Sequence, residues 1–227
     1  SLSMLGLLLY SFSLRVGHPY NLEWMEGGML VHGLRAMEGD SLYPPPSSDF
    51  IPFIYPPLYS WMLAGLGHLF GLGYAVGRSL SLAGTLAAAL ALVFAVRQEG
   101  GRLAVGAASA ALFLSTYDES GTFMDLVRTD GICLALIGWS LVSVRGGRTI
   151  LGGALLCLAF LSKHNAAIFG FPCLWWLWRY RGRGSALRFV AASAGPALLA
   201  TGLMQWSTDG LFLTYLLGVP SKHPFVG

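Results

Sequence analysis

Long apolar segments recur along this chain, separated by short polar loops, several of which carry arginine. Charged residues account for only 11% of its 227 residues and the mean hydropathy is +0.62, whereas a soluble domain carries about 25% charge. A charged side chain near the centre of a membrane helix costs roughly 2.5–3.5 kcal/mol, so a chain this poor in charge suits a lipid environment. The pattern predicts an all-α fold, a multi-pass transmembrane helical bundle.

We predict about seven spans, although several are shorter than the roughly 20 residues that cross a bilayer and must be extended by flanking residues. No small-residue cleavage site follows residues 2–14, so we interpret this run as the end of a span and not as a signal peptide. The chain is therefore expected to be truncated at both ends. The predicted spans cover residues 2–14, 79–96, 103–116, 131–144, 150–161, 166–178 and 186–204.

Basic residues occupy every second loop, and such loops belong on the cytoplasmic side of a membrane. This arrangement predicts a plasma (inner) membrane protein whose other polar segments face the outside or periplasm. The basic loops carry Arg97 and Arg102, then Arg145 and Arg148, then Arg179, Arg181 and Arg183; the external segments are 15–77, 117–130, 163–165 and 205–227.

The segment 57–71 is also apolar enough to span, but counting it as a span would place the arginine clusters outside. Pro56 and Pro57 suit the first turn of a helix that lies at the membrane surface. We therefore predict a single transmembrane module over residues 1–227, with juxtamembrane helices inside the external loop 15–77.

Two carboxylates, Glu23 and Glu26, stand in the first external loop. The pattern from Glu26 to Met37 predicts a short helix ended by Gly39, on which both acids share the apolar face and His32 falls on the other side. Acids that point toward an apolar bundle are candidates for acid–base or metal chemistry. The alternative is an ordinary exposed loop with its acids in solvent.

A second polar motif, RTDG, places Arg128 and Asp130 at the external start of a span. The carboxylate could bind a metal or a cation, and the planar guanidinium could hold a phosphate. Helix capping at the membrane interface would explain the same two residues, because an acid is favoured near a helix N-terminus.

Further polar groups occur in the external segments. Lys163, His164 and Asn165 form a tight turn that could bind an anion, although a lysine at a membrane edge commonly extends to the interface. Arg78, at the external end of a span, is an interface anchor or a phosphate ligand. Tyr55, in FIYPPLYSW, belongs to an aromatic belt or to a substrate site.

Other classes of function leave signals that this sequence lacks. There is no basic run interleaved with aromatic residues, so no nucleic-acid partner is predicted. No phosphate-cradling glycine loop, nucleophile elbow or zinc signature is present. Cys133, Cys157 and Cys173 have neither disulfide nor zinc spacing, so we expect them to be packing residues.

Several motifs follow one another in a fixed order: LEWMEGG, then YPPLYSW, GRSLSLAG, RTDG and LAFLSKHN. The ordered set, which covers nearly the whole chain, resembles the GT-C superfamily of integral-membrane glycosyltransferases. The resemblance is especially to bacterial relatives of the protein O-mannosyltransferases and the lipid A aminoarabinose transferase, which are glycosyltransferase family 39-like. The shared module of that superfamily has seven spans.

The resemblance implies transfer of a sugar from a polyprenyl phosphate to a lipid, glycan or protein acceptor, with inversion, at the outer face of the bilayer. The catalytic base of the family maps onto Glu26, with Glu23 as its competitor because the family's Asp–Glu pair is missing here. Asp130 would hold a divalent ion, Mg or Mn. Lys163 and Arg128 would stabilise the leaving phosphate.

Two other functions remain open. A membrane transporter or channel usually buries charge at the bilayer midplane, whereas the charges here gather in the external segments. A non-catalytic lipid-binding membrane subunit would keep the fold without the chemistry, and the missing Asp–Glu pair is consistent with it.

Overall fold

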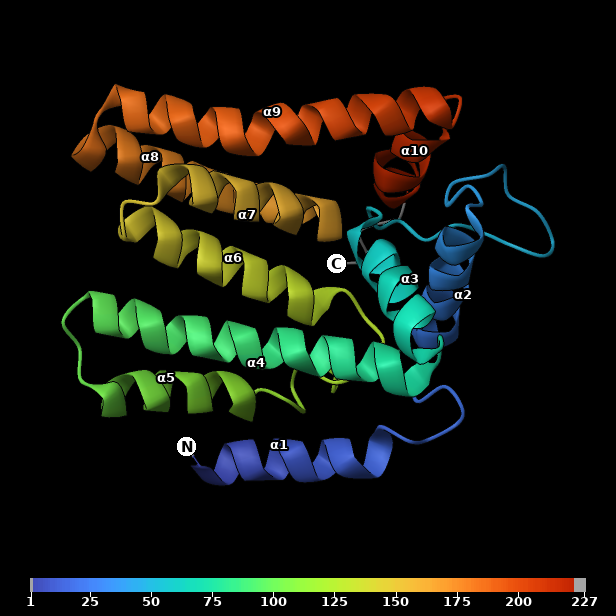
Figure 1. Cartoon of the computed structure of the whole chain (residues 1–227), viewed down its shortest axis with the longest axis horizontal. Helices are drawn as coiled ribbons and strands as arrows, with labels where there is room; N and C mark the ends of the chain where they lie inside the picture. The colour runs from blue at the N-terminus through green and yellow to red at the C-terminus, as the bar shows by residue number, and fades with distance from the viewer. Residues whose placement is uncertain (1, 223–227) are drawn as a thin grey trace.

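The computed structural model describes residues 2–222, and every regular element in that part of the chain is a helix (Figure 1). The predicted all-α class is therefore confirmed. Residues 223–227, the end of the predicted external tail, lie outside the described residues. The helices are α1 (Leu2–Arg15), α2 (Met25–Glu38), α3 (Leu58–Phe70), α4 (Tyr74–Gln98), α5 (Leu103–Ser115), α6 (Asp130–Arg145), α7 (Thr149–Ser162), η1 (His164–Phe169), α8 (Gly170–Arg181), α9 (Arg183–Ser207), α10 (Leu211–Leu213), η2 (Thr214–Gly218) and η3 (Pro220–Lys222).

The helices α1 and α4 to α9 lie along a common axis, and α2, α3 and α10 gather at one end of them (Figure 1). We call this the polar end, because the segments 16–73, 116–129 and 163–169 meet there. The short connections α4–α5, α6–α7 and α8–α9 lie at the opposite end (Figure 1). We call it the arginine end, after the basic residues that these connections carry.

Small residues allow the two central helices, α4 and α6, to approach each other closely. A Cβ atom added to Gly84 would lie 2.6 Å from the backbone carbon of Gly131, and one added to Gly131 would lie 2.5 Å from the carbonyl oxygen of Ser81. Backbone cannot yield as a flexible side chain can, so both positions require glycine for this packing.

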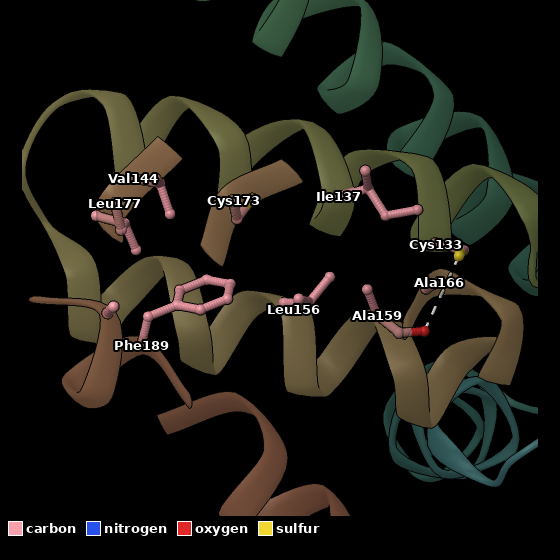
Figure 2. Packing of buried hydrophobic residues seen from close by; sticks show 10 residues of the cluster. Cys133, Ile137, Val144, Leu156, Ala159, Ala166, Cys173, Leu177 and Phe189 are labelled. Atoms are coloured by element: carbon pink, nitrogen blue, oxygen red, sulfur yellow. Dashed lines mark hydrogen bonds between the residues drawn. The ribbon is translucent and has the colours of Figure 1, made fainter. Parts of the chain in front are cut away.

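The core of the other half of the bundle is built by α6, α7, α8 and α9, which meet around Leu156, Leu177 and Phe189 (Figure 2). Cys133 and Cys173 belong to the same cluster, and the Sγ atom of Cys133 lies 3.9 Å from the carbonyl oxygen of Ala159 (Figure 2). All three cysteines are buried and free, which confirms their prediction as packing residues.

Two helices of the described chain, α4 and α9, are long and apolar enough to cross a membrane by length and composition. Each has 25 residues, and α5 and α7 are apolar but shorter. The finding supports two candidate spans, and the total of about seven stays a prediction.

The predicted helix in the first external loop is confirmed by α2, which ends at Gly39 with φ of 77°, the left-handed region that favours glycine. His32, predicted on the other side of that helix from the two acids, is buried all the same. Its Nε2 atom accepts a hydrogen bond from the backbone N–H of Phe53 at 3.0 Å, and the two rings stack with centroids 5.0 Å apart. Burial lowers the pKa of His32, so the ring is a neutral packing residue.

Candidate functional site

Four charged side chains at the polar end form an unbroken chain of ion pairs. The Nη1 atom of Arg128 lies 3.2 Å from Oε2 of Glu23, and its Nε atom lies 3.1 Å from Oδ2 of Asp130. The Nζ atom of Lys163 lies 2.7 Å from the other carboxylate oxygen, Oδ1 of Asp130. We call Glu23, Arg128, Asp130 and Lys163 the ion-pair chain.

The ends of two helices hold Asp130 beside Lys163. Asp130 is the first residue of α6, and Lys163 follows the last residue of α7. The hydroxyl of Thr129 donates to the carbonyl oxygen of Ser162 at 3.0 Å, and both residues are buried. This buried bond ties the start of α6 to the end of α7, so the carboxylate and the ammonium group meet whenever the two helices pack.

Aromatic and thioether groups border the two cations. The Nζ atom of Lys163 lies 5.7 Å from the ring centroid of Tyr55, and the guanidinium carbon of Arg128 lies 3.8 Å from that of Phe123. The Sδ atom of Met25 lies 3.1 Å from Nη1 of Arg128. Aromatic faces attract cations, so Tyr55 and Phe123 help to fix both charges at the polar end.

Both cations keep hydrogen-bond donors that are not used elsewhere in residues 2–222. A guanidinium has five N–H donors and an ammonium has three. The recorded bonds of Arg128 use Nε and Nη1, and that of Lys163 uses one donor to Asp130. A phosphate could therefore accept from Nη2 of Arg128 and from Nζ of Lys163 without breaking the existing contacts.

Glu26 and Arg78 form a separate ion pair that is fully buried. Nε and Nη2 of Arg78 donate to the two carboxylate oxygens of Glu26 at 2.9 and 2.8 Å. Its remaining donors go to the carbonyl oxygens of Arg15, His18 and Tyr20, at 2.7–2.8 Å. All five donors of Arg78 are thus engaged within the protein. The expected role of Arg78 as a phosphate ligand does not fit this geometry.

The surroundings of Glu26 do not suit a general base. Its carboxylate also accepts from the backbone N–H groups of Leu22 and Val127, at 2.7 and 3.0 Å. Burial would raise the pKa of Glu26, but the bonds from Arg78 and from these two N–H groups outweigh burial and lower it. A carboxylate that is buried, fully paired and hard to protonate is a poor proton acceptor.

Glu23 is better placed to accept a proton. Its side chain is 16% exposed, whereas that of Glu26 has no exposure. The Oε2 atom of Glu23 accepts from the N–H of Met25 at 3.0 Å, and no hydrogen bond within residues 2–222 involves Oε1. Of the two acids that the sequence leaves open, the geometry favours Glu23.

A third acid, Asp125, was not singled out in the sequence. It is fully buried, accepts from the Tyr117 hydroxyl at 3.0 Å and lies 3.4 Å from Nη1 of Arg15. Its Oδ2 atom has no hydrogen-bond partner in the described chain. Burial raises the pKa of Asp125 despite the nearby arginine. The only sequence signal for Asp125 is its position as a single acid among apolar residues in TFMDLVR.

The donor set does not fit the divalent ion expected at Asp130. Both oxygens of that carboxylate already contact cations, Arg128 and Lys163. No group of three or more His, Cys, Asp or Glu side chains within residues 2–222 is arranged to hold a metal.

His164, next to Lys163, has a buried Nδ1 atom without a partner in the described chain, and burial lowers its pKa.

Comparisons with protein families, with characterised proteins and with solved structures find no match to this chain.

Proposed function

We propose that the chain is a membrane-embedded bundle of about seven spans. The strongest support comes from α9, because only 11% of its most apolar stretch is buried inside the protein. Leu198 and Leu199 are each at least 65% exposed. Such a large exposed apolar surface is unfavourable in water but favourable in contact with lipid. The shorter helices gain length from their neighbours, since η1 runs directly into α8 and the helical backbone is continuous over the predicted span 166–178.

The function we infer is transfer of a sugar from a polyprenyl-phosphate donor to an acceptor at the polar end. The observation that carries it is the ion-pair chain, which gathers two cations with unused donors and two partly exposed carboxylates on residues far apart in sequence. The motifs that resemble the GT-C superfamily supply the same residues. A bound phosphate would sit against Arg128 and Lys163, with its apolar tail beside the bundle.

The transfer step needs one proton acceptor. Glu23 takes the proton of the acceptor hydroxyl as its oxygen attacks the anomeric carbon. The bond from that carbon to the phosphate oxygen breaks, and the phosphate leaves with the electron pair. Attack opposite the leaving group inverts the anomeric carbon. Arg128 and Lys163 stabilise the charge that grows on the phosphate, and Asp130 positions both cations.

The direct test is release of polyprenyl phosphate by purified protein in liposomes, with a panel of polyprenyl-phosphate-linked hexoses and pentoses as donors. Glu23→Gln should lower turnover by about 10²–10⁴-fold, the usual contribution of a general base. Glu38→Gln, the same change at an exposed acid of α2, is the matched control and should keep full turnover. Full turnover by Glu23→Gln would contradict the assignment, and solute uptake without donor consumption would favour a transporter.

A further inference from the structure

Three arginines at the arginine end line a single pocket between the starts of α7 and α9. The pocket has a volume of about 590 Å³ and is lined by Arg148, Arg181 and Arg188 together with Thr149 and Ser185. Three arginines and two residues with hydroxyl side chains thus border one hollow. We call this the arginine pocket.

No carboxylate in the described chain neutralises these three arginines. Glu99 is the one acidic residue in the connections at this end, and it pairs with Arg145. Within residues 2–222, Arg148, Arg181 and Arg188 form no ion pair with an acidic side chain. All three are exposed to solvent, so an anion can reach them, and it would offset the positive charge gathered there.

Local contacts aim two of the guanidinium groups and leave donors free. Arg188 donates through Nε to the carbonyl oxygen of Gly184 at 3.2 Å and through Nη2 to the hydroxyl of Ser185 at 3.3 Å. Arg181 donates through Nη2 to the carbonyl oxygen of Arg145 at 3.4 Å, and its guanidinium lies near the turn at Gly147. Positive φ at this glycine, 81°, allows the tight turn.

The backbone adds positive potential at the same place. The helix α7 begins at Thr149, and no side chain caps its N-terminus. The first N–H groups of a helix lack partners within it, and the helix dipole favours an anion there. Thr149, Ile150 and Leu151, the first three residues of α7, all line the arginine pocket.

We propose that the arginine pocket binds a phosphate group. Planar guanidinium groups match phosphate oxygens in pairs, and the two hydroxyls and the start of α7 supply further donors. The phosphate would come from the head group of an anionic phospholipid or from free phosphate in solution. Ile150 and Leu187 are 61% and 65% exposed, so an apolar surface for acyl chains flanks the site. The inference does not depend on sugar transfer at the polar end.

The test measures binding to the purified chain in neutral-lipid nanodiscs, with two probes. One probe is phosphatidylglycerol titrated into phosphatidylcholine, and the other is inorganic phosphate. Changing Arg148, Arg181 and Arg188 together to Gln should weaken binding by at least about tenfold, since each arginine near a charged lipid surface contributes about 1 kcal/mol. Saturable binding of phosphatidylglycerol alone would assign the lipid head group as the source, and binding of both probes would assign the phosphate itself.

The matched control changes Arg97, Arg102 and Arg179 to Gln. It removes the same charge from the same end, outside the arginine pocket, and should keep binding within about twofold of the wild-type chain. Equal weakening in both triple variants would show diffuse attraction and overturn the proposal, as would failure of both probes to bind. Both triple variants are also made on a Lys163→Ala background, which removes a proposed phosphate ligand of the polar end, so that binding lost on changing Arg148, Arg181 and Arg188 there arises at the arginine pocket.

Discussion

Arg78 and Glu26 form a two-bond ion pair, at 2.9 and 2.8 Å, in which neither side chain is exposed to solvent. Arg78 belongs to α4, and its other donors bind the carbonyl oxygens of Arg15, at the end of α1, and of His18 and Tyr20, in the segment that joins α1 to α2. The pair therefore fixes the segment between α1 and α2 onto α4 and sets the position of Glu23, three residues before Glu26.

Breaking this pair should destabilise the protein. Arg78→Lys cannot replace five directed donors, and Glu26→Gln leaves the buried guanidinium without its counterion. Each change should lower the free energy of unfolding by about 3–5 kcal/mol, as for other buried pairs that lose one partner. Unfolding in mixed detergent micelles, followed by circular dichroism, measures the effect. Unaltered stability of both variants would mean that the Arg78–Glu26 pair does not stabilise the fold.

Lys163 should contribute to donor binding more than to folding. Its side chain is one-quarter exposed, so Lys163→Met should change the unfolding temperature little. A charge-assisted hydrogen bond contributes about 1.5–3 kcal/mol, so loss of one to the phosphate should raise KM for the donor by about tenfold or more. Steady-state kinetics over a range of donor concentrations gives the value. An unchanged KM would remove Lys163 from the phosphate site.

Asp125 should make the protein less stable as pH rises. Because burial raises the pKa of Asp125 above its ordinary value of 3.8, the folded state holds this proton at pH values where the unfolded chain has released it. Stability is then lost as pH increases from about 3.8 through the higher folded pKa. Asp125→Asn removes that loss, so the variant should gain stability relative to the wild type toward neutral pH. Melting curves from pH 4 to 8 test this, and parallel pH profiles for the two proteins would contradict it.

The contact between α4 and α6 should depend on its glycines. Gly84→Ala places a Cβ atom 2.6 Å from the backbone of α6, which should cost roughly 1–3 kcal/mol and shift Asp130 at the start of that helix. Both the unfolding temperature and donor turnover should fall. Gly202→Ala in α9 meets no atom within 4 Å and serves as the control, with no loss of either. Equal behaviour of the two variants would argue against close packing at Gly84.

The sequence predicted those features that depend on neighbouring residues. Gly39 ends α2 as expected, and RTDG and LSKHN fall at the facing ends of α6 and α7. The sequence could not decide whether Glu23 or Glu26 is the candidate base, because two acids three residues apart are equivalent until the residue that pairs with one of them is known. The partner of Glu26 is Arg78, 52 residues away. Burial of Asp125 likewise arises from packing against α1, which no local pattern encodes.

The most direct test of the proposed function is a map of the protein in nanodiscs with a bound polyprenyl phosphate. We expect the phosphate within hydrogen-bond distance of Nη2 of Arg128 and Nζ of Lys163, with Oε1 of Glu23 facing the position of the transferred sugar. A phosphate that binds elsewhere and makes no contact with Arg128 or Lys163 would contradict the proposed function.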